Sequence, residues 1–210
     1  MTLRERLRAA RLYVITADAA PERVMESASA ALRGGADIVQ LRHKALARGE
    51  LLELARDLRR AATTALFIVN DHLDIALLSE ADGVHLGPDD LSIASARRVA
   101  GDRLLIGASA SSAAAGRDAV SQGADYLGSG PAFATPIKAG KAVIGPQGVA
   151  EVAAALPDVP VFAIGGIDEG NVAELIAVGV RRACVLRAVS GATDPEGAAR
   201  RLRAMLVADR

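Results

Sequence analysis

The chain has 210 residues, which is enough for one domain with a full hydrophobic core. Its 25 basic and 25 acidic residues give a formal net charge of +0, which argues against a nucleic-acid or anionic-membrane surface as its main partner. Aromatic residues make up 2% of the chain and tryptophan is absent, so a stacking platform for single-stranded nucleic acid is not expected.

Short apolar segments rich in β-branched residues alternate with amphipathic segments along the whole chain. The apolar segments predict strands, which we expect at residues 12–16, 37–42, 66–70, 82–87, 104–107, 124–128, 159–164 and 182–186. The amphipathic segments predict helices, which we expect at residues 21–32, 51–62, 75–78, 93–99, 113–121, 146–156, 168–178 and 195–207. Residues 129–145 are the longest irregular stretch, and loops of this length in compact domains are commonly functional.

Roughly eight strand–helix units of this kind predict an α/β fold with a parallel sheet, and a (β/α)8 TIM barrel more readily than an open sheet. There is no linker, low-complexity tract or break in composition, so we expect residues 1–210 to form a single TIM-barrel domain. Functional groups in such barrels gather at the C-terminal ends of the strands. Polar residues scattered along the chain are therefore expected to converge in space.

The first residues are charged and lead into no apolar signal core, and no apolar run is long enough to span a bilayer. We therefore expect a cytoplasmic protein that acts on small molecules, with no nucleic-acid or membrane partner. The single cysteine, Cys184, lies in an apolar run and is expected to be a buried small hydrophobe. A homo-oligomer is compatible with these observations, which do not determine the oligomeric state.

Three long polar side chains alternate at the end of the strand expected at residues 37–42. Gln40, Arg42 and Lys44 share one face if the strand geometry continues, because alternate residues of a strand point the same way. Two cations and an amide suit a phosphorylated ligand. The alternative is a solvated strand end with a surface arginine and lysine.

Carboxylates follow the next two strands. Asp71 comes directly after Asn70, and Asp90 follows the strand expected at residues 82–87. Two carboxylates without histidine or cysteine partners suit a hard ion such as Mg2+, which takes few protein ligands and shares its other positions with water and phosphate oxygens. Each aspartate could instead cap a helix, and Asp89 is a competing ligand. Together with the nearby cations, Asp71 and Asp90 predict a Mg2+ site.

The later loops add hydroxyl, cationic and backbone donors. Glycines allow a close approach of backbone to a ligand in the loop after residue 128, and the turns after the last two strands are where barrels often bind phosphate. The candidates there are Ser109, Thr135, Lys138, Gly165, Gly166, Leu186 and Arg187. Arg187 could instead be only a surface cation. His85 lies within an expected strand, where a core role is commoner than that of a base.

These motifs, taken together, resemble the thiamine phosphate synthase family. They are Gln-Leu-Arg-x-Lys at residues 40–44, Asn-Asp at 70–71 with residues 81–87 and Asp90, Ile-Gly-x-Ser at 106–109, Gly-Pro at 130–131 with Thr135 and Lys138, and Ile-Gly-Gly-Ile at 164–167. The match keeps one order from the first expected strand to the last helix. Its specificity lies in the combination rather than in any single motif.

The resemblance implies a (β/α)8 enzyme that joins 4-amino-2-methyl-5-hydroxymethylpyrimidine diphosphate to thiazole phosphate and releases pyrophosphate. In such enzymes the pyrimidine leaves its diphosphate as a carbocation, which the thiazole nitrogen captures. By this likeness the pyrimidine diphosphate would contact Gln40, Arg42, Lys44, Asn70, Ser109 and Lys138. The thiazole phosphate would lie by Thr135, Ile137, Gly166, Leu186 and Arg187, and Asp71 and Asp90 would hold Mg2+.

Three departures from the family pattern bear on rival functions. Ile137 stands where the family often has threonine, and Pro88 where glutamine is common. The run Ser109-Ala110-Ser111 lacks the histidine that is often seen just after that serine. The related thiazole tautomerase resembles the synthase in fold and needs a histidine there, so its absence argues against that metal-free isomerase. A non-catalytic sensor of thiamine precursors is a further alternative, disfavoured by Asp71 and Asp90. An unrelated phosphosugar isomerase would require a general base that we do not find.

Overall fold

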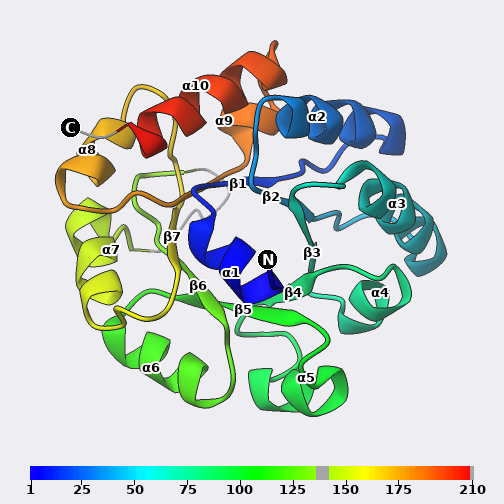
Figure 1. The fold of residues 1–210 in the computed structure, drawn as a ribbon, viewed down its shortest axis with the longest axis horizontal. Helices are drawn as coiled ribbons and strands as arrows, with labels where there is room; N and C mark the ends of the chain where they lie inside the picture. The colour runs from blue at the N-terminus through cyan, green and yellow to red at the C-terminus, as the bar shows by residue number, and fades with distance from the viewer. Residues whose placement is uncertain (136–141, 209–210) are drawn as a thin grey trace.

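The computed structural model describes residues 1–135 and 142–208, and its strands close into a single parallel barrel in chain order (Figure 1). Every strand pairs in parallel with its neighbours, and β1 pairs with β8 to complete the ring. The strands are β1 (Leu12–Ile15), β2 (Ile38–Leu41), β3 (Leu66–Asn70), β4 (Gly83–Leu86), β5 (Leu105–Ala110), β6 (Tyr126–Ser129), β7 (Val161–Ile164) and β8 (Ala183–Val185). The predicted (β/α)8 barrel is therefore confirmed.

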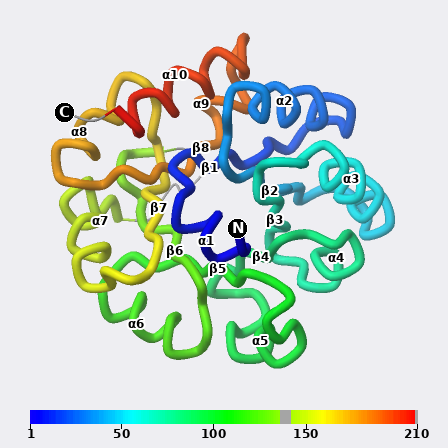
Figure 2. The backbone as a smooth tube through the Cα atoms, in the orientation of Figure 1, coloured from blue at the N-terminus to red at the C-terminus, as the bar shows by residue number. Residues whose placement is uncertain are grey.

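Helices pack around this barrel and over one end of it, and the backbone trace in Figure 2 shows all but the first of them as an outer ring. They are α1 (Leu3–Ala9), α2 (Pro21–Arg33), α3 (Arg48–Ala61), α4 (Leu73–Leu78), α5 (Ile93–Ala100), α6 (Ala113–Ser121), α7 (Gly145–Ala154), α8 (Val172–Ala177), α9 (Arg187–Ser190) and α10 (Pro195–Val207). Of the residues that the structure describes, none belong to a helix long and apolar enough to cross a membrane.

Two helices were not expected from the sequence. The charged segment at the N-terminus forms α1, where Thr2 and Glu5 build a capping box and Leu7 is buried. The four-residue α9 is too short to show a periodic pattern. The expected helix over residues 168–178 begins later, at Val172, because Asp168 accepts from the Gly170 N–H in a turn of its own.

Alternate strand residues face opposite sides of the barrel wall. The outward set, such as Val14 and Phe67, packs against the helices in one large apolar cluster. The inward set forms a second, smaller cluster that includes Leu7 of α1. Helix α1 lies across the middle of the ring in Figure 1, so it covers the N-terminal end of the barrel and leaves the opposite end for a ligand.

Three aspartates tie neighbouring strands together where they start. Asp37 accepts from the Leu12 N–H at 3.0 Å, Asp82 from the Phe67 N–H at 2.7 Å, and Asp125 from the Ile106 N–H at 2.9 Å. Each carboxylate also pairs with an arginine of the helix layer, namely Arg203, Arg59 and Arg97 in that order. The pattern recurs across β1 and β2, β3 and β4, and β5 and β6, and it pins the register of each pair.

Asp82→Ala tests this clamp. The Asp82 side chain is 12% exposed, so its removal leaves the Phe67 N–H and the Nη1 of Arg59 without their acceptor in a region with little water. We expect the free energy of unfolding to fall by about 3 kcal/mol. Glu53→Ala, which removes an exposed ion pair with Arg56 on α3, should change it by less than about 0.5 kcal/mol. Urea denaturation measures both, and equal losses would contradict a clamp at Asp82.

Candidate functional site

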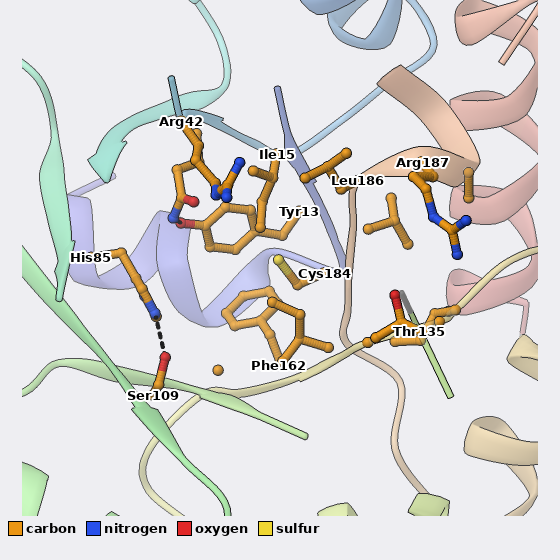
Figure 3. A pocket seen from close by; sticks show the side chains of 18 of the residues that line it. Tyr13, Ile15, Arg42, His85, Ser109, Thr135, Phe162, Cys184, Leu186 and Arg187 are labelled. Carbon is orange, nitrogen blue, oxygen red and sulfur yellow. Dashed lines mark hydrogen bonds between the residues drawn. The ribbon is translucent and has the colours of Figure 1, made fainter. Parts of the chain in front are cut away.

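A cavity of about 420 Å3 opens at the C-terminal end of the barrel, and side chains from every strand or the loop after it line its wall. This volume is in the range of small-molecule sites. Figure 3 shows Arg42, His85 and Ser109 toward one side of the cavity and Thr135 and Arg187 toward the other. The cavity therefore has two polar ends on either side of an apolar floor.

Most of the candidate residues from the sequence come together around this cavity. Those that line it are Gln40, Arg42, Asn70, Ser109, Thr135, Gly165, Gly166, Leu186 and Arg187. Lys44, Asp71 and Asp90 do not line the cavity itself. Arg42 and Lys44 nevertheless lie close enough to Asp71 for their charges to oppose the rise in its pKa that burial and Asp90 cause. Ile137 and Lys138 lie outside the described residues.

The floor of the cavity is aromatic, and reasoning from the sequence did not identify it. The Tyr13 and Tyr126 hydroxyls are 3.0 Å apart, and the Gln40 amide nitrogen donates to the Tyr13 hydroxyl at 2.7 Å. The Phe162 ring meets both tyrosine rings edge-on. These side chains are inward members of β1, β6 and β7. The only hint in the sequence was Gly107, a glycine inside an expected strand, which leaves the room that Tyr126 occupies. A Cβ at Gly107 would lie 2.1 Å from the Tyr126 ring.

His85 also lines the cavity, although the sequence favoured a core role for it. Its Nε2 lies 3.1 Å from the Ser109 hydroxyl, an interaction drawn in Figure 3. Strand β6, two places along the barrel from β4, carries Gly128 opposite the imidazole, where a Cβ would lie 3.3 Å from the ring. His85 therefore orients the hydroxyl of a predicted ligand-binding serine, and its strand position did not reveal this.

Asp71 and Asp90 form a close carboxylate pair at the edge of the site. Asp71 adopts a left-handed backbone conformation with φ 62°, and its N–H donates to the His85 carbonyl at 2.9 Å. Asp90 accepts from the Gly87 N–H at 2.7 Å. Burial and the neighbouring Asp90 carboxylate raise the pKa of Asp71 to about 6. The fold thus holds two like charges together at a cost in stability.

This pair fits Mg2+ better than a softer metal. The described residues include no group of three or more His, Cys, Asp or Glu side chains arranged to hold a metal ion. Mg2+ needs only one or two carboxylates when water and substrate phosphates supply the remaining oxygens. The like-charge repulsion between Asp71 and Asp90 is what a bound divalent cation would relieve.

The opposite end of the cavity is built by a tight glycine turn and by the segment that packs against it. Gly165 and Gly166 have positive φ of 103° and 66°, and a Cβ at Gly166 would lie 2.6 Å from the Ala134 carbonyl oxygen. The Phe133 N–H donates to the Gly165 carbonyl at 2.9 Å, which fixes the segment that leads to Thr135 beside this turn. Arg187 begins the short helix α9 next to it, so a hydroxyl, backbone groups and a cation meet here.

Comparison with known proteins gives a consistent result. A model of the family described as thiamine monophosphate synthase matches residues 12–189. The chain is 49% identical to the thiamine-phosphate synthase of Thermobifida fusca, over 99% of this chain and 97% of that protein. It is 47% identical to the thiamine-phosphate synthase of Gloeobacter violaceus over 92% of its own length, but it spans only 56% of that relative. The solved structure of the thiamine phosphate pyrophosphorylase from Pyrococcus furiosus is 38% identical, covers 98% of both chains and superposes with a TM-score of 0.86.

Asp71→Asn tests the carboxylate pair in protein stripped of metal with EDTA. Asparagine tolerates the left-handed backbone and removes one of the two like charges. Because folding raises the pKa of Asp71, its ionised form lowers the free energy of unfolding at pH 8. The site is partly open to solvent, which reduces the size of this effect. The variant should therefore be more stable by about 1 kcal/mol at pH 8.

The same gain should disappear below about pH 3, where the wild-type carboxyl is mostly protonated in both the folded and the unfolded state. Urea denaturation at the two pH values measures the difference. Asp89→Asn, at an exposed neighbour of Asp90, is the matched control and should change little. A destabilised Asp71→Asn variant at pH 8 would contradict the repulsion.

Proposed function

We propose that this chain, which belongs to the thiamine monophosphate synthase family, joins hydroxymethylpyrimidine diphosphate to thiazole phosphate with release of pyrophosphate. The observation that carries the proposal is the arrangement of two separate polar ends, each with an arginine, around one apolar cavity, with a carboxylate pair beside only one of them. A reaction between a diphosphate and a monophosphate needs two such ends. The end beside the carboxylates is suited to the more highly charged diphosphate.

At the diphosphate end, Arg42 and Lys44 would neutralise the phosphate oxygens. Gln40 and Asn70 line the cavity beside them and offer amide groups to the pyrimidine, while Ser109 offers a hydroxyl held by His85. Asp71 and Asp90 would hold Mg2+, which supplies further positive charge for the departing diphosphate. The predicted contact of Lys138 with the diphosphate stays a prediction.

At the other end, the thiazole phosphate would meet Thr135, Gly166 and Arg187. Backbone N–H groups near a glycine turn and an adjacent cation are suited to a phosphomonoester. Leu186 provides an apolar wall next to them. The predicted contact of Ile137 likewise stays a prediction.

The reaction forms a C–N bond and breaks a C–O bond. The diphosphate leaves with the electron pair of the C–O bond, and the lone pair of the thiazole nitrogen then bonds to the electron-poor methylene carbon. No proton has to move in this exchange, which agrees with a cavity that offers charge-stabilising groups rather than an evident acid–base pair. The chain's contribution is to hold the two partners in line and to stabilise the charge on the leaving group.

The alternatives receive less support. A thiazole tautomerase-like isomerase would have no use for Asp71 and Asp90, which the fold keeps together despite their repulsion. A non-catalytic sensor would not need a cavity with two anion-binding ends. The relatives reported above, at 47–49% identity, are named as synthases.

The direct test is an endpoint assay with purified protein, both substrates and Mg2+, in which thiamine phosphate is detected by fluorescence after oxidation. We expect product with Mg2+ and none when EDTA is present. No product from folded protein would overturn the proposed synthase activity, and conversion of thiazole phosphate alone into a tautomer would favour the isomerase.

Asp90→Asn tests the metal-holding role. The substitution keeps an oxygen that can accept from the Gly87 N–H but removes one of the two negative charges. We expect the rate at saturating substrates to fall by at least about 100-fold, and the concentration of Mg2+ needed for half the maximal rate to rise. Asp89→Asn should leave both quantities close to wild type. If Asp89→Asn has the larger effect, Asp89 is the ligand instead.

A further inference from the structure

The loop that carries Arg42 and Lys44 is hydrogen-bonded to the loop after β1. Thr16 is fully buried, and its hydroxyl accepts from the Arg42 N–H at 3.0 Å and donates to the Arg42 carbonyl at 3.1 Å. Its own N–H donates to the Gln40 carbonyl at 3.0 Å, which continues the pairing of the two strands. These bonds therefore fix the position of the Arg42 backbone, from which its side chain extends.

His43 ties the same two loops together by its ring. Its Nδ1 accepts from the Leu46 N–H at 3.1 Å, so the proton of a neutral ring lies on Nε2, which is 2.8 Å from the Ala19 carbonyl oxygen. This geometry gives His43 a structural role. It also explains why His43 points away from the cavity that Arg42 lines.

Asp18, between these ties, holds both cationic residues. One carboxylate oxygen accepts from the Arg42 Nη1 at 2.8 Å, and the other accepts from the Lys44 backbone N–H at 2.7 Å. Burial opposes the charge of Asp18, but the Lys44 N–H and the Arg42 guanidinium outweigh it and lower the pKa of Asp18. Asp18 is therefore an ionised acceptor with one bond to each partner.

The single contact to Arg42 leaves most of its binding capacity for a ligand. A guanidinium has five N–H donors, and Asp18 accepts from one nitrogen only. The Arg42 side chain is 18% exposed and lines the cavity, so its other donors are directed by the Asp18 contact rather than used up by it. The charge of Arg42 also reaches the Asp71 carboxylate, where it opposes the rise in the pKa of that group.

We propose that Asp18 is a positioning residue, which acts through Arg42 and Lys44 to hold the diphosphate end of the site in its binding geometry. Asp18 itself does not line the cavity. The inference rests on the proposed function for its substrate, and it adds a residue of the β1–α2 loop that none of the predicted contacts include.

Asp18 has two opposing effects on diphosphate binding, and the direction in which binding changes in a neutral variant shows which effect is larger. As a negative charge near a diphosphate it repels the ligand, so its neutralisation alone would tighten binding. As a positioning group it keeps Arg42 in place, so its neutralisation would weaken binding. Asp18 is 42% exposed, which screens its repulsion of the ligand, whereas a small displacement of a substrate-binding group can cost up to about 100-fold. We expect the positioning effect to prevail.

The experiment measures binding of inorganic pyrophosphate with Mg2+ by calorimetry, together with KM for both substrates. Asp18→Asn should raise the Kd for pyrophosphate and the KM for pyrimidine diphosphate by about tenfold. The KM for thiazole phosphate should stay within about twofold of wild type. Glu53→Gln, which neutralises the carboxylate of an exposed Glu–Arg pair on α3, is the matched control. It should change neither the Kd for pyrophosphate nor the two KM values.

Two further variants separate positioning from charge. Asp18→Glu keeps the charge but moves the carboxylate, so it should weaken pyrophosphate binding if position matters. In an Arg42→Ala background, Asp18→Asn should have much less effect than it has in the wild type, because the two residues act as a unit. Circular dichroism and urea denaturation establish that each variant is folded.

Tighter or unchanged pyrophosphate binding in Asp18→Asn would overturn the proposal, as would an equal rise in both KM values or an undiminished effect in the Arg42→Ala background. If the wild type binds pyrophosphate and Asp18→Asn weakens this binding, but the wild type makes no thiamine phosphate, the inference on Asp18 holds and the proposed function is rejected. A wild-type protein that binds no pyrophosphate would overturn both.

Discussion

The register of the barrel strands is the constraint on which the site depends. Asp37, Asp82 and Asp125 each accept from a backbone N–H at the start of the preceding strand and pair with an arginine from the helix layer. A slip of one residue would turn every inward side chain outward. These clamps lie at the N-terminal end of the barrel and the ligand groups at the opposite end, so stability and function occupy different ends of the same strands.

With the register held, the size of each inward side chain shapes the cavity. Gly107 and Gly128 leave space beside Tyr126 and His85, and the two tyrosines and Phe162 fill the floor below. Glycines on β5 and β6 therefore make room for two of the side chains that line the cavity. The polar groups stand above this floor at the strand ends, where water or a charged ligand can reach them.

The charges at the diphosphate end are arranged for a ligand rather than for stability. Asp71 and Asp90 repel each other, while Arg42 is partly neutralised by Asp18 and lies near Asp71. A cation at the carboxylates and an anion at Arg42 and Lys44 would complete this alternation of charge. Substitutions that relieve the repulsion are thus expected to stabilise the protein and to impair it, a trade-off seen at many active sites.

The sequence alone determined the barrel, because each strand and helix carries its own periodicity, and it determined the candidate residues at the strand ends, since a parallel barrel brings those ends together. It identified the family through motifs in one continuous order. Only the tertiary structure decided that Tyr13 meets Tyr126, that His85 meets Ser109, and that Asp18 meets Arg42. Those partners lie 24 to 113 residues apart, and the pattern along a chain specifies which face a residue takes but not which distant side chain it will meet there.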